Sequence, residues 1–291
     1  MKSIAVVGSI NIDTTIYMDK FPKKGETIIA NFSNESLGGK GCNQAIAINN
    51  AGGDVIFYGS IGNDDKGQSA REYIGNFGLP TNLTVSNNKE TGSASILVEA
   101  SGENRIVVLK GANENVTKEA LPVEAFNKDI VVLQNEIPFE TVKSLMEVYK
   151  DKIVVFNPAP TKEIDETIFK YVTYLLVNEG ELEFYGKYTS DPISYLLNLG
   201  IKNLIVTLGK RGSTLYSKEE AIHVDASKAV AIDTVAAGDT YIGYFTAMIA
   251  EGKNKKEAME IASIASGISV TRKGAAISIP KREEVIKWKK K

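Results

Sequence analysis

The residues of this sequence best suited to chemistry form one short run, Asp233-Thr234-Val235-Ala236-Ala237-Gly238-Asp239-Thr240. We expect a strand to end at Asp233, and the apolar pattern of residues 240–250 predicts an amphipathic helix directly after the run. Small side chains at a helix start leave the first backbone N–H groups open to a ligand, and the helix dipole favours an anion there. Because phosphate is a common anion at such a position, the run predicts a phosphate site.

Asp239 is the unusual member of this run, because a carboxylate beside a bound anion is unfavourable. One interpretation is that its side chain only caps the helix, as Asp often does. The other is that Asp239 takes a proton from a hydroxyl group that attacks a phosphoryl group. The second interpretation predicts phosphoryl transfer.

A second run, Leu37-Gly38-Gly39-Lys40-Gly41-Cys42-Asn43-Gln44, begins a predicted helix that continues to Asn50. Its glycines bring backbone N–H groups and the Lys40 ammonium to one place, next to the Asn43 amide. Such a loop could bind an anionic or hydroxyl-rich ligand. The alternative is a glycine turn with no ligand.

The elements that must position these runs follow a strand-then-helix order. Apolar runs predict strands at residues 3–9, 55–61, 130–134, 153–157, 174–178 and 204–208. Helical patterns cover residues 65–77, 140–150, 163–171, 179–186 and 255–270, with a less clear one from 212 onward. This alternation predicts an α/β fold with a doubly wound, mostly parallel sheet. Because strand C-termini share one edge of such a sheet, the polar residues that follow them should form one cleft.

Four further strands have no helix between them and predict a small antiparallel β-sheet. They are residues 14–17, 27–32, 93–99 and 105–110. We expect them to belong to two insertions, at about 11–37 and 91–110, in a single domain of residues 1–291. A last hairpin is expected from residues 213–216 and 221–224.

Composition excludes several function classes. The 291 residues contain one Cys and one His, which excludes an internal disulfide and a zinc site of paired Cys and His. A net charge of −2 gives no electrostatic footprint for nucleic acid. No P-loop occurs, so any nucleotide must be held without one. No G-x-G-x-x-G fingerprint occurs either, which argues against a dinucleotide oxidoreductase. We expect a soluble cytoplasmic protein without a signal peptide or membrane segment.

The two runs resemble the two signatures of the ribokinase-like (PfkB) family of carbohydrate kinases. The resemblance extends along nearly the whole chain through residues 8–13, 157–160, 178–181, 207–212 and 270–274. Residues 157–160 (Asn-Pro-Ala-Pro) and 270–274 are most similar to the members that phosphorylate ribose. Two long signatures in this order and at this spacing are specific for the family.

The resemblance implies an α/β core with a small β-sheet lid, and homodimers joined through the lids. It implies that Asp239 is the catalytic base, which takes the proton from the 5-hydroxyl of the sugar. It also implies an anion hole for the transferring phosphoryl group, formed by the amides of Ala236, Ala237 and Gly238. The sugar contacts it implies are Asn11, Asp13, Gly39, Lys40, Asn43, Glu136 and Asp239.

For the phosphoryl donor, the resemblance implies ATP. The implied ATP contacts are Asn178, Glu181, Thr207, Gly209, Gly212, Gly238 and Ser263. Mg²⁺ is expected between the phosphates, held mostly through water near Asn178 and Glu181. A monovalent cation, K⁺, is expected within a ring of mostly carbonyl oxygens from Asp233, Val235, Ser269, Arg272, Gly274 and Ser278.

The expected function is therefore transfer of the γ-phosphoryl group of ATP to the 5-hydroxyl of D-ribose. A family kinase for another sugar or a nucleoside is the alternative within the class. A non-catalytic sugar-binding protein of the same fold is the alternative outside it, and Asp239 argues against that one. The chain departs from the family pattern at Ser263, where Asn or another residue is expected beside adenine, at Cys42, which replaces the usual Ala, and at Tyr241, which replaces the usual Phe.

Overall fold

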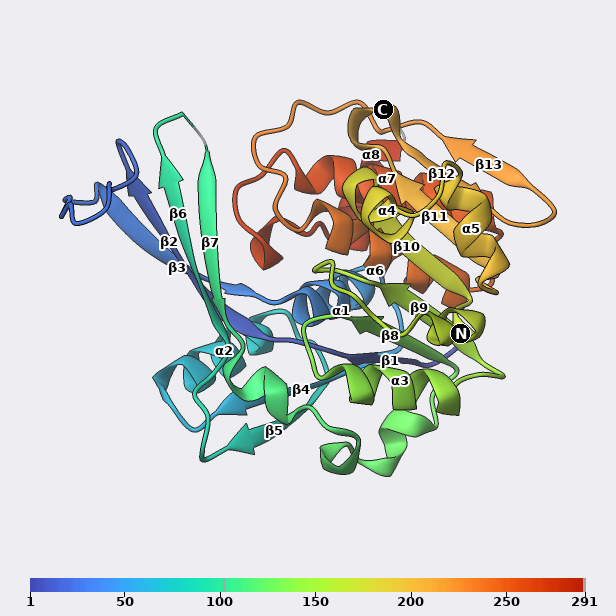
Figure 1. Ribbon diagram of the computed structural model, residues 1–291, viewed down its shortest axis with the longest axis horizontal. Coiled ribbons are helices and arrows are strands. Elements are labelled where there is room, and N and C mark those ends of the chain that lie inside the picture. The colour runs from blue at the N-terminus through green and yellow to red at the C-terminus, as the bar shows by residue number, and fades with distance from the viewer. Residues whose placement is uncertain (102, 290–291) are drawn as a thin grey trace.

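The computed structural model describes residues 1–101 and 103–289, and its strands form two separate sheets (Figure 1). The larger sheet has nine strands in the order β13-β12-β11-β10-β9-β8-β1-β4-β5. All neighbours from β11 to β5 pair in parallel, and only β12 and β13 are antiparallel. The bounds are β1 (Ile4–Val7), β4 (Val55–Gly62), β5 (Thr81–Ser86), β8 (Ile130–Gln134), β9 (Ile153–Asn157), β10 (Tyr174–Asn178), β11 (Asn203–Thr207), β12 (Ser213–Tyr216) and β13 (Ala221–Val224). The predicted fold class is confirmed.

Helices cover both faces of this sheet because its strands are apolar on both sides. In β1, Ile4 and Val6 belong to one core cluster, whereas Ala5 and Val7 belong to the other. The first cluster is completed by α1 (Lys40–Asn50), α2 (Asp65–Asn76), α6 (Ala237–Ala250), α7 (Lys255–Ser269) and α8 (Arg282–Lys289). The second is completed by α3 (Phe139–Val148), α4 (Glu179–Tyr185) and α5 (Pro192–Asn198). None of the described helices has the length and hydropathy needed to cross a membrane.

The smaller sheet projects from one side of the larger one and is called the lid below (Figure 1). Its order is β3-β2-β6-β7, with β2 (Asn11–Met18), β3 (Phe32–Gly38), β6 (Ser93–Glu99) and β7 (Asn104–Leu109). The sheet is mixed, because β2 and β6 pair in parallel. The predicted strand at 27–32 was wrong: the partner of β2 begins at Phe32 and continues to Gly38, so that it leads directly into α1.

Other local predictions also need correction. No strand ends at Asp233, since residues 225–236 are irregular and are tied to α7 through the Ile232 N–H, which donates to the Val270 carbonyl at 2.7 Å. The helix after them is not amphipathic: α6 is buried on nearly every side because it lies between α1 and α7. The pattern at 163–171 folds as a 3₁₀ helix, Glu166–Tyr171, and residues from 212 onward form β12 rather than a helix. Strand β5 and helix α5 were not predicted.

The contact between α1 and α6 depends on Gly243. A Cβ added at this residue would lie 2.3 Å from the Ala47 Cβ and 2.8 Å from the Gln44 carbonyl oxygen. The two backbones therefore approach as closely as they do only because residue 243 has no side chain.

We predict that Gly243→Ala lowers the free energy of unfolding by about 1–3 kcal/mol, because it forces α1 and α6 apart. Urea unfolding measures this loss. The matched control is Gly75→Ala in α2, where an added Cβ meets no atom within 4 Å. The control should be neutral or stabilising by up to about 1 kcal/mol through helix propensity. Equal effects of the two substitutions would contradict the close-contact argument.

Candidate active site

The N-terminus of α6 is the centre of the candidate site. Ala236, the N-cap residue, has φ 58° and ψ 8°, and it is the non-glycine residue with positive φ in the described part of the chain. Strain of this kind concentrates at functional sites. The Ala237 N–H donates to the Thr234 carbonyl at 3.2 Å, whereas those of Ala236 and Gly238 have no acceptor among the described residues. Two of the three amides predicted for an anion hole are thus free to bind a ligand.

The Asp239 carboxylate lies at this helix end and is 7% exposed. Its Oδ2 accepts a hydrogen bond from Asn43 Nδ2 at 3.2 Å, and its Oδ1 accepts one from Gln44 Nε2 at 2.9 Å. Both donors belong to the first turns of α1. The side chain of Asp239 does not act as the N-cap of α6, which excludes the capping interpretation.

Glycines bring the start of α1 to this place. Gly39 has φ 89°, and a Cβ there would lie 2.8 Å from Ile10 Cα. At Gly41 a Cβ would lie 2.6 Å from the Ser9 nitrogen. The helix start therefore packs against the loop that follows β1, and Gly39 and Gly41 allow this close packing within the protein.

Lys40 is surrounded by carboxylates. Burial acts against its charge, but the negative charges of Asp239, Glu136 and Glu181 outweigh burial and raise the pKa of Lys40. The ammonium forms no ion pair within the part of the chain that the structure describes, and it lines a cavity with Asp239 and Glu181. Glu136 accepts hydrogen bonds from the Lys40 backbone N–H at 2.9 Å and from the Ser9 hydroxyl. Lys40 is thus a cation available to an anionic ligand.

The residues predicted to bind the sugar lie near the point where the chain passes from β1 of the main sheet into β2 of the lid. Burial, and then the nearby charge of Glu136, raise the pKa of Asp13 to about 7. Its buried Oδ1 has no hydrogen-bond donor among the described residues. Asn11 accepts a hydrogen bond at Oδ1 from Asn113 Nδ2 at 2.9 Å, which leaves the Asn11 amide group as a donor.

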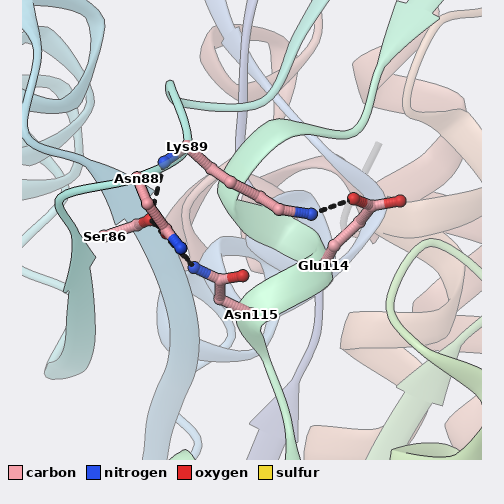
Figure 2. Close-up of polar contacts among 5 residues, drawn as sticks. All are labelled: Ser86, Asn88, Lys89, Glu114 and Asn115. Carbon is pink, nitrogen blue, oxygen red and sulfur yellow. Dashed lines mark hydrogen bonds and ion pairs between the residues drawn. The ribbon is translucent and has the colours of Figure 1, made fainter.

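Asn113 belongs to a 3₁₀ turn, Gly111–Asn115, that is fastened to the chain entering the lid (Figure 2). Asn115 Nδ2 donates to the Ser86 hydroxyl at 2.8 Å, and Glu114 pairs with Lys89. Asn113 itself accepts from the Ile10 N–H at 2.9 Å and donates to the Ile10 carbonyl at 3.1 Å. These bonds hold the base of the lid and orient Asn11.

Two adjoining cavities extend from the α6 N-terminus and share Thr207, Thr234 and Gly238. The first, of about 280 Å³, is lined mostly by small side chains and backbone. Five residues predicted to bind ATP line it: Thr207, Gly209, Gly212, Gly238 and Ser263. The second, of about 200 Å³, is more polar, and it contains Asn178, Glu181, Lys40 and Asp239. The predicted sugar contacts Asn11, Asp13, Gly39, Asn43 and Glu136 line neither cavity.

The nucleotide-side residues differ in what they can offer a ligand. Asn178 and Glu181 form a capping box at the start of α4, with the Asn178 Oδ1 accepting from the Glu181 N–H at 2.8 Å. Burial raises the pKa of Glu181. The Ser263 hydroxyl already donates to the Asp225 carbonyl at 3.0 Å and accepts from the Ser227 N–H at 3.1 Å. Ser263 therefore lines the cavity while its hydroxyl group holds the neighbouring loop.

The loops predicted to hold a monovalent cation are joined by Asp233. Its Oδ1 accepts from the Val235 N–H at 3.0 Å, and its Oδ2 accepts from the Gly274 N–H at 2.9 Å. The hydroxyl groups of Ser269 and Ser278 are buried and donate to the carbonyls of Ser266 and Ala275, and Arg272 pairs with Glu284. The groups left to a cation are oxygen atoms, mainly carbonyls with one carboxylate, which suits a hard cation. Within the described residues, no three His, Cys, Asp or Glu side chains gather as a metal cluster.

Sequence reasoning missed four side chains that position the others: Ser9, Gln44, Asn113 and Gln134. Gln44 lies within the second run and could have been considered there. Ser9 lies within residues 8–13, which carry part of the family resemblance, whereas no local pattern distinguishes Asn113 and Gln134 from ordinary turn or strand-end residues.

Comparisons with known proteins agree with this geometry. The sequence profile of the family described as pfkB family carbohydrate kinase matches residues 1–282. The ribokinase of Staphylococcus aureus (strain COL) is 34% identical over 298 residues, covering 97% of this chain and 98% of that protein. The crystal structure of ribokinase from Thermotoga maritima is similar with a TM-score of 0.95 and 40% identity, covering 100% of both chains. Arabidopsis thaliana ribokinase, complexed with ribose and ATP, has a TM-score of 0.92 and 30% identity, covering 99% of this chain and 98% of that one.

A lidded, mostly parallel α/β sheet with a buried carboxylate beside free amides at a helix N-terminus suits phosphoryl transfer, and the matches to carbohydrate kinases show that the class is phosphotransferase. The chain belongs to the pfkB family of carbohydrate kinases. The predicted family is confirmed.

The raised pKa of Asp13 predicts a pH-dependent stability. Between pH of about 4 and about 7, Asp13 holds a proton in the folded protein and has released it in the unfolded chain. The contribution of Asp13 to the free energy of unfolding is therefore fully present below its usual pKa of 3.8 and is lost as the pH rises through about 7. The free energy of unfolding of the wild type, minus that of Asp13→Asn, should fall across this window by up to about 1.4 kcal/mol per pH unit. Urea unfolding of both proteins at several pH values measures it, and a difference independent of pH would contradict the assignment.

Proposed function

We propose that this protein transfers the γ-phosphoryl group of ATP to the 5-hydroxyl of D-ribose. The observation that carries the proposal is the buried Asp239 carboxylate beside free amides at the α6 N-terminus, where two cavities meet. Ribose as the substrate is supported by similarity over nearly the whole chain to proteins named ribokinase, one of them complexed with ribose and ATP. A kinase for another sugar or a nucleoside is the alternative within the family.

The two cavities suit the two parts of the nucleotide. The first cavity is lined by small, mostly apolar groups and is suited to a base and ribose, next to Thr207, Gly209 and Gly212. The second carries Lys40, Asn178 and Glu181 and would receive the phosphates. Because both reach Gly238, a nucleotide that spans them would place its terminal phosphate at the α6 N-terminus. The helix dipole and the free N–H groups favour an anion there.

The reaction follows from the groups at this point. The sugar hydroxyl oxygen forms a bond to the γ-phosphorus while the bond between that phosphorus and the bridging oxygen of ADP breaks. Asp239 takes the hydroxyl proton. The free amides at the α6 N-terminus and the Lys40 ammonium stabilise the negative charge on the oxygens of the group in transfer. Asn11, Asp13, Gly39, Asn43 and Glu136 would hold the other sugar hydroxyls, which both donate and accept hydrogen bonds.

Two cations belong to the proposal. Mg²⁺ would lie near Asn178 and Glu181, mostly through water, and would neutralise phosphate charge. K⁺ would be held by oxygens of Asp233, Val235, Ser269, Arg272, Gly274 and Ser278, and would add positive potential beside the α6 N-terminus. Asp233 already joins the two loops concerned, which supports a site between them. The single, buried cysteine, Cys42, supports a reducing, cytoplasmic location.

The proposal is tested by turnover of a panel of pentoses, hexoses and nucleosides with ATP and Mg²⁺, each with and without K⁺. D-ribose should give a far higher kcat/KM than fructose, deoxyribose or adenosine, and K⁺ should raise the rate. A higher value for another sugar would end the ribose assignment and leave the kinase assignment intact.

Asp239→Asn is the companion variant for the same panel. It should retain ribose binding by calorimetry but lose about 10²–10⁴-fold in kcat, the usual contribution of a general base. A variant that keeps most of its rate would show that the base is elsewhere.

The lid supports the proposal of a homodimer. Strand β7 is an edge strand of the lid, and Ile106, Val107, Val108 and Leu109 are each at least half exposed. Exposed apolar edge strands invite pairing with another chain, and a second copy would cover them.

We expect light scattering to give twice the chain mass of 31.5 kDa for the wild type. Val107 and Leu109 point to one face of β7, and Ile106 and Val108 point to the other. Two double variants therefore replace either Val107 and Leu109 or Ile106 and Val108 by lysine. The variant on the face that the partner covers should have the mass of one chain. The control is Val123→Lys, which alters an equally exposed valine outside the lid and should remain dimeric. A wild-type protein with the mass of one chain would refute the dimer.

A further inference from the structure

A chain of buried amides connects the Asp239 carboxylate to the end of β8. Gln44 Nε2 donates to Asp239 Oδ1 at 2.9 Å, and Gln134 Nε2 donates to Gln44 Oε1 at 2.7 Å. Gln44 and Gln134 are both 0% exposed, so water does not substitute for these bonds. The three residues come from α6, α1 and β8, which lie far apart in the sequence.

The neighbours of Gln44 determine which way its amide points. Asn157 Nδ2 donates to the Leu176 carbonyl at 3.0 Å, so the Asn157 Oδ1 faces away as an acceptor, 3.5 Å from Gln44 Nε2. One end of the Gln44 amide therefore meets two acceptors, Asp239 Oδ1 and Asn157 Oδ1, and must be the NH₂ group. The opposite orientation would place the Gln44 oxygen against a carboxylate.

Gln134 holds Gln44 from the other side, and the fold makes room for it. A Cβ added at Gly8 would lie 2.2 Å from Gln134 Oε1. The loop after β1 thus passes directly over the Gln134 amide, and it can do so because Gly8 has no side chain. With Gln134 as donor, every polar atom of the Gln44 amide has a partner.

We propose that Gln44 and Gln134 are positioning residues for the transfer reaction: together they fix the direction and rotation of the Asp239 carboxylate. This inference rests on the proposed function, in which Asp239 is the base. With Oδ1 held by Gln44, rotation of the carboxylate is restricted, and Oδ2, beside Asn43, is the oxygen that receives the proton. A base that must meet a hydroxyl within hydrogen-bond reach loses rate when its orientation is not maintained.

The test compares Gln44→Met, Gln134→Met and the double variant with the wild type. Methionine approximates the volume of glutamine but cannot donate to the carboxylate. Gln44→Met should lower kcat by about 10–100-fold, the cost of a displacement of about 1 Å, with the dissociation constants of ribose and ATP nearly unchanged. Gln134→Met, which leaves both direct donors of Asp239 in place, should lower kcat by less. The double variant should resemble Gln44→Met, because residues acting in one chain are not additive.

A matched control separates the positioning role from a general loss of protein stability. Asn49, on the same helix, donates to the Phe77 carbonyl at 3.0 Å, away from the site. Asn49→Met should melt at a lower temperature yet keep its kcat. If Gln44→Met fails to fold, Gln134→Met still decides the matter through its kcat and its ribose affinity.

Two results would overturn the inference. The first is that Gln44→Met or Gln134→Met has the same kcat as Asn49→Met. The second is that the fold-losses of kcat in the two single variants multiply in the double variant. Asp239→Asn distinguishes the inference from the proposed function on which it rests. If that variant keeps its rate, Asp239 is not the base, and the part of the proposed function on which this inference rests fails. If it loses its rate while the glutamine variants do not, only the positioning role fails.

Discussion

The contact between the start of α1 and the start of α6 is the interaction on which the site depends. It places the amides of Asn43 and Gln44 on the two oxygens of Asp239. The two helices approach closely enough only because Gly243 has no side chain, and α1 begins where it does because Gly39 and Gly41 pack against the loop after β1. Glycines at the start of α1 and within α6 therefore bring backbone segments together, and the position of the Asp239 carboxylate is a consequence of that packing.

Charge at the site is organised around Lys40. Burial would lower the pKa of an isolated lysine, but three carboxylates raise it, so the cation is maintained next to the cavity. Carboxylates at the site also affect one another: burial and then the charge of Glu136 raise the pKa of Asp13, and burial, with a contribution from Asp239, raises the pKa of Glu181. An anionic ligand in this cavity would change the balance, since Lys40 would then face that ligand as well as the protein.

The lid and the main sheet are connected through a segment that carries Asn11, one of the residues predicted to bind the sugar. Strand β2 of the lid begins at Asn11, shortly after β1 of the main sheet ends, and Asn113 binds both the Ile10 backbone and the Asn11 side chain. The turn that carries Asn113 is fastened to the chain entering β6 by Asn115 and Glu114. Residues that would contact the sugar are therefore supported by the same segments that support the lid.

The sequence by itself determined most of the strand-and-helix order of the main sheet, the family and the two runs at helix starts, because these depend on local apolar periodicity and on contiguous motifs. The predictions from sequence misplaced β3 and described α6 as amphipathic, because strand register and burial on a second face depend on partners distant in the chain. Only the tertiary structure decided that Asp239 is held by Asn43 and Gln44 rather than capping its own helix, and that Gln134, Ser9 and Asn113 support the site. Single polar residues at strand ends leave no periodic signal, and their role arises only when the fold brings three or four segments into hydrogen-bond distance.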